Sequence, residues 1–248
     1  MNILLTNDDG YHAKGLQLLR RVMANHSTWI VAPDGERSAI SHAITLWDPL
    51  RAQPLSDREY IASGTPTDCA YLGLHGLLSE TPDCVLSGVN HGPNLGIDVL
   101  YSGTVAAAME AARINVPAMA LSLATHRPED KDWKLVEERI PELFDLFVKL
   151  QKDDPSLLLN VNFPPLRAGH TPKIRLTRLG EVVYPQHIDE KFDPRGRPYY
   201  WIGGKPPTWD TDPETDCGCI LAGDISVTPL KLDITHTSLL QKLRNQLS

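Results

Sequence analysis

Residues 1–10, MNILLTNDDG, run from a short apolar segment almost directly into two adjacent carboxylates. The apolar segment Ile3–Thr6 predicts a buried β-strand, because it lacks the polar alternation of a strand that has one face in water. Asp8 and Asp9 follow it, and Gly10 permits a turn that would bring both side chains to one side of the chain. Two carboxylates at the end of a buried strand repel each other and lose hydration, so this pair needs a compensating partner.

Further apolar runs follow along the first half of the chain, and amphipathic helical patterns separate them. Strands are predicted at residues 29–32, 84–87 and 118–122, and helices at residues 14–25, 66–78 and 103–113. In the first helix Leu16, Leu19 and Met23 recur at the spacing of one helix face. Apolar strands that alternate with helices are typical of a mostly parallel sheet covered on both faces. The sequence therefore predicts an α/β fold.

The second half of the chain has a different texture. A charged helical pattern over residues 130–152 and an apolar strand over residues 157–161 come first. From about residue 165 to 235, proline and glycine are frequent and short β-like runs appear. We interpret residues 165–235 as a β-rich C-terminal extension within a single domain of residues 1–248, with a short helix near the end. Its segment 180–230 looks too extended to fold back alone, so we expect an arm exchanged between subunits.

The composition limits the partners and the compartment. The 248 residues carry 24 Lys and Arg against 31 Asp and Glu, and this net charge of −7 disfavours binding to a nucleic-acid polymer. No apolar run reaches the ~18 residues of a membrane-spanning helix, and the first residues lack the pattern of a signal peptide. The four cysteines are too scattered for a disulfide framework. We therefore expect a cytoplasmic protein without a membrane partner.

Polar residues follow the ends of three predicted strands, where parallel α/β sheets bind their ligands. These residues are Asp8 and Asp9, then Ser38 within PDGERS, then Asn90 and Asn94 within NHGPN. Taken singly, the serine and the asparagines are typical of polar loops. Taken with the two carboxylates, they form an oxygen-rich set suited to Mg²⁺, Mn²⁺ or Ca²⁺. The alternative is that one aspartate only caps the next helix.

Two predicted helices start with small and hydroxyl-bearing residues. Ser102, Gly103 and Thr104 open an alanine-rich helix, and SGTPT at residues 63–67 opens another. Such residues cap helix N-termini, and the free amides there bind anions such as phosphate. The glycine fingerprint of dinucleotide-binding folds is absent from the sequence, which argues against a dinucleotide-binding oxidoreductase on the same architecture. A non-catalytic binding protein is the other alternative.

Longer motifs point to a known family. The blocks ILLTNDDG, VAPDGERSAIS, SGTPTDC, SGVNHGPNLGIDVLYSGTVAAAMEAA, NVNFP and ISVTPL occur in this order through nearly the whole chain. Together they resemble the stationary-phase survival protein SurE family. The resemblance implies a Rossmann-like fold, with a β-hairpin exchanged between the subunits of a homodimer or homotetramer. It also implies a metal-dependent nucleotidase, a phosphatase acting on nucleoside 5′- and 3′-monophosphates and possibly on short polyphosphate.

The same resemblance assigns roles to individual residues. The ligands of one divalent cation per subunit, Mg²⁺ or Mn²⁺, would be Asp8, Asp9, Ser38 and Asn90. The residues on the phosphate-binding side would be Asn94, Ser102, Gly103 and Thr104. Ser38 is assigned as a ligand because it follows Pro-Asp-x-x-Arg, as the family serine does. Small departures from the family pattern, such as Thr6 where serine is common, remove none of these residues.

The expected reaction is hydrolysis of a phosphate monoester by a metal-activated water. Asp8 and Asp9 are the expected catalytic residues, and either could orient the attacking water. Helix N-terminal amides near residues 102–104 would stabilise charge on the transferring phosphoryl group. An aspartyl-phosphate intermediate on either aspartate is the alternative route.

Overall fold

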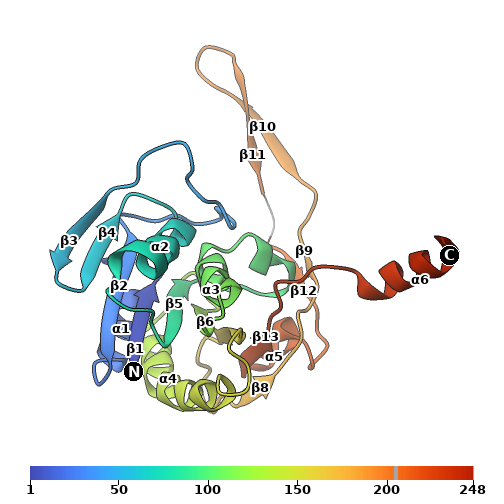
Figure 1. Ribbon diagram of the computed structural model, residues 1–248. Coiled ribbons are helices and arrows are strands. Elements are labelled where there is room, and N and C mark those ends of the chain that lie inside the picture. Colours follow the sequence, from blue (N-terminus) through green and yellow to red (C-terminus); the bar gives the residue numbers. More distant parts are fainter. Residues whose placement is uncertain (204–205, 248) are drawn as a thin grey trace.

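A computed structural model describes residues 1–203 and 206–247 and shows a nine-stranded central sheet with helices packed against it (Figure 1). The strand order is β3-β4-β2-β1-β5-β6-β7-β13-β8. The pairs β3–β4 and β7–β13 are antiparallel, and the other neighbours in this sheet are parallel. The predicted mostly parallel α/β fold is therefore confirmed.

The strands of this sheet follow the apolar runs of the sequence. They are β1 (Asn2–Thr6), β2 (Ser27–Pro33), β3 (Ala52–Ser56), β4 (Glu59–Ala62), β5 (Cys84–His91), β6 (Ala118–Leu123), β7 (Leu158–Phe163), β8 (Ile174–Leu176) and β13 (Ile225–Pro229). The helices are α1 (Lys14–Val22), α2 (Pro66–Leu72), α3 (Gly103–Arg113), α4 (Asp130–Leu150), α5 (Asp216–Ala222) and α6 (Thr237–Leu247). A π-helical turn, η1 (Gly73–Leu77), extends α2, and a 3₁₀ turn, η2 (Gly96–Leu100), precedes α3.

Alternate residues of β1 face opposite layers of the core. Ile3 and Leu5 pack in the cluster that contains buried residues of α1 and α4. Leu4 packs in a second cluster, formed with α2 and α3. This period-two division explains the unbroken apolar run of β1, because both faces of a central strand are covered.

The two predicted helix starts are present. Ser102 is the N-cap of α3, and its Oγ accepts a hydrogen bond from the Val105 amide. Thr65 is the N-cap of α2, where it forms a reciprocal capping box with Asp68. Hydroxyl groups at these positions satisfy amide donors that have no partner within the helix. The starts of the two helices also lie next to each other, since a Cβ atom on Gly103 of α3 would lie 2.9 Å from Pro66 Cγ of α2.

The β-rich extension divides into three parts. Strands β8 and β13 join the central sheet, and the short strands β9 (Val182–Val183) and β12 (Thr208–Trp209) pair with each other. Strands β10 (Ile188–Phe192) and β11 (Pro198–Ile202) form an antiparallel hairpin that projects from the body, and α6 also extends away from it (Figure 1). Tyr200 and Trp201 on the hairpin are largely exposed.

Some local structure differs from the sequence prediction. The pair β3–β4 was not predicted, because Pro54 and mostly exposed or half-exposed residues obscure the strand pattern of residues 52–62. The helix predicted over residues 66–78 is instead α2 followed by η1. Within the described residues, no helix has the length and apolar character needed to cross a membrane.

Candidate active site

The sheet reverses its direction of growth at β1, which has β2 on one side and β5 on the other. Ligands of open α/β sheets bind in the crevice that such a reversal leaves beyond the strand ends. Thr6, the last residue of β1, pairs with Ser87 of β5, and β5 continues to His91, whose backbone amide contacts Asp9 in the turn after β1. This is where the carboxylates after β1 meet the asparagine at the end of β5.

Asp8 is almost fully buried against the start of α3. Thr104 Oγ1 donates a hydrogen bond of 2.5 Å to Asp8 Oδ1. A Cβ atom placed on Gly103 would lie 3.0 Å from Asp8 Cβ, so this helix start touches the carboxylate side chain. Burial raises the pKa of Asp8 to about 6, although hydrogen bonding from Thr104 opposes the shift. The protein thus holds this carboxylate where its charge is costly.

Asp9 lies beside the end of β5. Its Oδ2 accepts a hydrogen bond of 3.2 Å from the backbone amide of His91. Burial raises the pKa of Asp9, the nearby His91 lowers it, and the charge of Glu36 raises it further. Three segments of the chain therefore converge on this carboxylate: the turn after β1, the end of β5 and the loop after β2.

The carboxylate pair suits a divalent cation. In the described part of the chain, no Lys or Arg side chain forms an ion pair with Asp8 or Asp9. The N-cap of α1 is Ala13, without a side-chain capping bond, so neither aspartate caps the following helix and that alternative is wrong. Two close carboxylates without a cationic partner are best stabilised by a hard metal ion.

The predicted ligand Ser38 lies in the exposed loop after β2. Its hydroxyl donates a hydrogen bond of 2.9 Å to Glu36, the residue whose charge acts on Asp9. The neighbouring Arg37 amide donates a hydrogen bond of 2.8 Å to the Asp8 carbonyl oxygen. These contacts bring the loop to the carboxylate pair, while the serine hydroxyl itself is engaged with Glu36.

The predicted ligand Asn90 is buried at the end of β5. Its Nδ2 donates a hydrogen bond of 3.0 Å to the Gly92 carbonyl oxygen, which turns the amide so that Oδ1 points the other way. An amide oxygen held by a bond on the nitrogen side is well suited to coordinate a cation. The next residue donates its backbone amide to Asp9, so Asn90 lies within one residue of the carboxylate contact.

Asn94 is a buried residue of the loop that follows β5. Its backbone amide donates to Asn162 Oδ1 at 2.9 Å, and its side-chain amide donates to Ser122 Oγ at 2.8 Å. Its carbonyl oxygen accepts bonds of 2.8 and 3.0 Å from the amides of Asn160 and Asn162. The structure therefore places Asn94 in a dense polar network, and these contacts with β7 were not predicted from the sequence.

The predicted phosphate-side residues Ser102, Gly103 and Thr104 form the start of α3 directly beside Asp8. Two of them have a role that sequence reasoning missed. Gly103 gives the carboxylate room, and the Thr104 hydroxyl binds it. A helix N-terminus beside a carboxylate pair that held a cation would offer amide donors and positive charge to the same anion.

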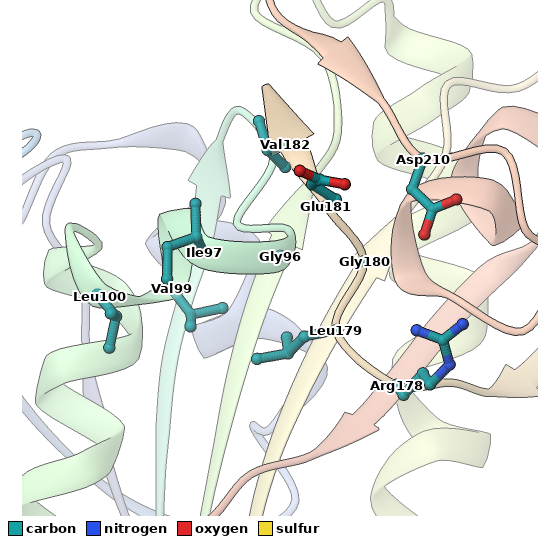
Figure 2. A pocket seen from close by; sticks show the side chains of 10 residues that line it. All are labelled: Gly96, Ile97, Val99, Leu100, Arg178, Leu179, Gly180, Glu181, Val182 and Asp210. Atoms are coloured by element: carbon teal, nitrogen blue, oxygen red, sulfur yellow. The ribbon is translucent and has the colours of Figure 1, made fainter. Parts of the chain in front are cut away.

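The polar residues of this edge do not line the cavity beside η2. That cavity, of about 680 Å³, is lined by η2 and by residues 178–182 and 210, and none of the predicted site residues lines it. Figure 2 shows its aliphatic side chains, among them Val99 and Leu179, apart from the charged Arg178 and Asp210. The described residues also hold no cluster of three or more His, Cys, Asp or Glu suited to a metal. A cation at this edge would therefore have to be held by two carboxylates together with neutral oxygens.

Comparisons with known proteins agree on one family. The family model described as Survival protein SurE matches residues 3–186. A protein of Anaeromyxobacter sp. (strain Fw109-5) named 5′-nucleotidase SurE is 49% identical over 99% of this chain and 95% of its own length. One of the same name from Desulforudis audaxviator (strain MP104C) is 45% identical over 98% of this chain and 96% of its own. The crystal structure of the SurE protein from Aquifex aeolicus superposes with a TM-score of 0.83 at 34% identity, over the whole of both chains.

Proposed function

This chain belongs to the SurE family, and from that membership we infer that it is a 5′-nucleotidase, which releases phosphate from nucleoside monophosphates. The family predicted from the sequence motifs is thereby confirmed. The observation that supports this edge of the sheet as the place of the activity is the pair of buried Asp8 and half-buried Asp9 beside the start of α3. Neither a dinucleotide-binding oxidoreductase nor a non-catalytic binding protein is favoured by the relatives.

We propose that the enzyme uses one divalent cation per subunit, Mg²⁺ or Mn²⁺. Its ligands are Asp8, Asp9, Ser38 and Asn90, whose loops meet at this edge of the sheet. When bound, the cation would withdraw charge from a phosphoryl oxygen and make a water molecule a better nucleophile. For Ser38 to act as a ligand, its hydroxyl must exchange the Glu36 bond for the cation, a rotation that an exposed serine makes at small cost.

The residues of the chain have distinct tasks in this proposal. The amides at the start of α3 bind non-bridging phosphate oxygens, with Ser102, Gly103 and Thr104 forming that segment and Asn94 contributing from the loop after β5. The Thr104 hydroxyl keeps Asp8 Oδ1 in one orientation. Water oxygen attacks phosphorus as the bond to the nucleoside oxygen breaks, and the nucleoside leaves with a proton. We assign orientation of the water to Asp8 or Asp9 as catalytic residues, without a phosphoenzyme.

The range of substrates is also a proposal. Nucleoside 3′-monophosphates and short polyphosphate present the same terminal phosphate group as 5′-monophosphates. The start of α3 and the carboxylate pair would contact only this phosphate group. We therefore expect the site to accept all three kinds of substrate. Base and sugar preference would be set outside this phosphate-binding edge.

Removal of the metal tests the proposed function. Phosphate release from a panel of nucleoside 5′- and 3′-monophosphates is expected to fall at least about tenfold when the protein is stripped with EDTA, and to return with Mg²⁺ or Mn²⁺. The measurement is colorimetric phosphate release at a fixed protein concentration, with Ca²⁺ as a third ion. Equal release with and without EDTA would remove the cation from the proposal. The absence of release under every metal condition would overturn the nucleotidase activity of this site.

We further propose that the single domain of residues 1–248 assembles as a homodimer or homotetramer in the cytoplasm, with its extension at residues 165–235 providing the contact. The projecting β10–β11 hairpin supports this, because it presents largely exposed side chains such as Phe192 and Trp201. We expect light scattering to give a mass two or four times that of the chain. A monomeric mass at micromolar concentration would contradict the exchanged arm.

A further inference from the structure

The motif NVNFP at residues 160–164 contributes two asparagines to the interior, and no step of the proposed reaction uses them. Asn160 and Asn162 lie two residues apart in β7, so they share one face of the sheet, and both side chains are fully buried. A buried amide is costly unless its polar atoms are paired. Their placement therefore needs a reason beyond the filling of space.

Both asparagines bind the backbone of Asn94. Asn162 forms a two-point pair with it, because its Oδ1 accepts from the Asn94 amide at 2.9 Å and its Nδ2 donates to the Asn94 carbonyl oxygen at 3.0 Å. Asn160 Nδ2 donates to the same oxygen at 2.8 Å. The amide side chains thus replace the strand partner that the Asn94 backbone lacks, and they pin one point of an irregular loop.

The pinned loop connects the end of β5, in the candidate active site, with the start of η2. It starts at Asn90, whose Nδ2 binds the Gly92 carbonyl oxygen, and it ends at Gly96, whose amide donates to buried Asp216 at 2.8 Å. Asn90 is in register with Ser122 of β6, and Ser122 with Asn162 of β7. A row of polar residues, Asn90, Ser122 and Asn162, therefore crosses the three strands beneath the loop. We call Asn160 and Asn162, which hold the Asn94 backbone, the clamp.

The clamp also orients the side chain of Asn94. Its Nδ2 donates one proton to Ser122 Oγ at 2.8 Å, and an amide nitrogen carries two protons. No second bond of this nitrogen occurs among the described residues. With the backbone held by Asn160 and Asn162 and the amide held by Ser122, the other N–H has one direction left, which suits a fixed donor to a phosphate oxygen.

From these contacts we propose that Asn160 and Asn162 are positioning residues, which hold Asn94 as a preorganised donor to the substrate phosphate. This inference rests on the proposed function, since it concerns the same site. It predicts an effect on phosphate binding rather than on the reaction step, because Asn94 contacts an oxygen in both the ground state and the transition state. Asn162 contributes two of the three bonds to the Asn94 backbone, so its loss is expected to matter more than that of Asn160.

The test compares Asn162→Ala and Asn160→Ala with the wild-type enzyme in its active metal form. For Asn162→Ala we expect KM for a nucleoside 5′-monophosphate and the inhibition constant of inorganic phosphate to rise together by about tenfold, with kcat falling less than about threefold. Asn160→Ala should shift both constants in the same direction by a smaller factor. If Asn162→Ala accumulates too poorly to be assayed, the smaller shifts expected in Asn160→Ala still test the proposal.

Thr177→Val is the matched control. Thr177 is buried, and its hydroxyl forms bonds of 2.8 and 2.7 Å with Ser226 and Thr228 of β13, so the variant also loses two buried hydrogen bonds near the same sheet. It should lose stability yet keep KM and the phosphate inhibition constant within about twofold. Equal shifts in Thr177→Val and Asn162→Ala would reduce the asparagines to structural residues and overturn the proposal.

A second readout separates this proposal from the proposed function. Backbone amide hydrogen exchange of residues 92–96, followed by mass spectrometry without substrate, should be faster in Asn162→Ala than in the wild type and unchanged in Thr177→Val. If the wild type releases no phosphate with any metal, the proposed function fails, while faster exchange still supports the clamp. Unchanged exchange together with unchanged KM would overturn the clamp and leave the nucleotidase intact.

Discussion

Replacement of Asp8 by asparagine is expected to lower phosphate release from a nucleoside monophosphate by about 1,000-fold, while the metal-free protein stays at least as stable as the wild type. Asn and Asp have nearly the same shape, so the buried site remains filled. The change removes the negative charge that would hold the cation and that burial makes costly. In Asp8→Asn, phosphate release should therefore fall while the free energy of unfolding of the metal-free protein stays the same or rises.

The measurement pairs steady-state phosphate release with urea unfolding in the presence of EDTA. Asp132→Asn is the matched control, because Asp132 is equally buried but its carboxylate accepts the amides of Glu129 and Leu166, at 2.8 and 2.7 Å, away from the site. That variant should lose stability and retain activity. Full activity in Asp8→Asn would remove this carboxylate from the metal site. Unfolding of Asp8→Asn under conditions where Asp132→Asn stays folded would make its role structural.

Replacement of Gly103 by alanine is expected to reduce activity by about 100-fold through crowding at the contact between α3 and Asp8. The added Cβ would lie 2.9 Å from Pro66 Cγ and 3.0 Å from Asp8 Cβ, so the helix start or the carboxylate has to move. A displacement of about 1 Å at a catalytic position costs activity on this scale. Alanine favours a helix over glycine, so the loss would not come from weaker helix formation.

Gly76→Ala provides the comparison for this variant. Gly76 is exposed in η1, and an added Cβ would meet nothing within 4 Å. The same chemical change there should leave kcat and KM within about twofold of the wild type. For both variants we would measure kcat, KM and the metal concentration that gives half-maximal activity. These values show whether a loss lies in the reaction step, in substrate binding or in metal binding. Wild-type values in Gly103→Ala would show that the helix start can shift without harm, and would contradict its tight packing against the carboxylate.

The parts of the fold that the sequence predicts are those encoded by local patterns. The run Ile3–Thr6 is apolar on both faces because β1 is covered by helices on both sides, and the pattern shows this directly. Ser102 and Thr65 predict helix starts because their hydroxyl oxygens accept hydrogen bonds from backbone amides three residues later. In both cases sequence neighbours determine the structure, so no tertiary information is needed.

The parts that the sequence does not predict depend on contacts between distant segments. Thr104 looks like a helix-start residue, yet its hydroxyl binds a carboxylate 96 positions earlier. The asparagines of NVNFP look like a polar strand end, and only the fold brings them to Asn94, more than 60 positions away. Likewise β3 and β4 pair beside a long loop, with Pro54 in one of them. Register and packing, rather than propensity, determine these features.

The position of β13 has a consequence for how the protein is made. Among the described residues, strand β8 pairs in the central sheet with β13 alone, and β13 separates it from β7. The ribosome adds about 5–20 residues per second, so several seconds pass between synthesis of Ile174 in β8 and Ile225 in β13. During that interval β7 lacks its antiparallel partner and is a bare sheet edge. A nascent chain that stalls in this interval would present a pairing-competent edge, and a premature stop before residue 225 would leave that edge permanently open to aggregation.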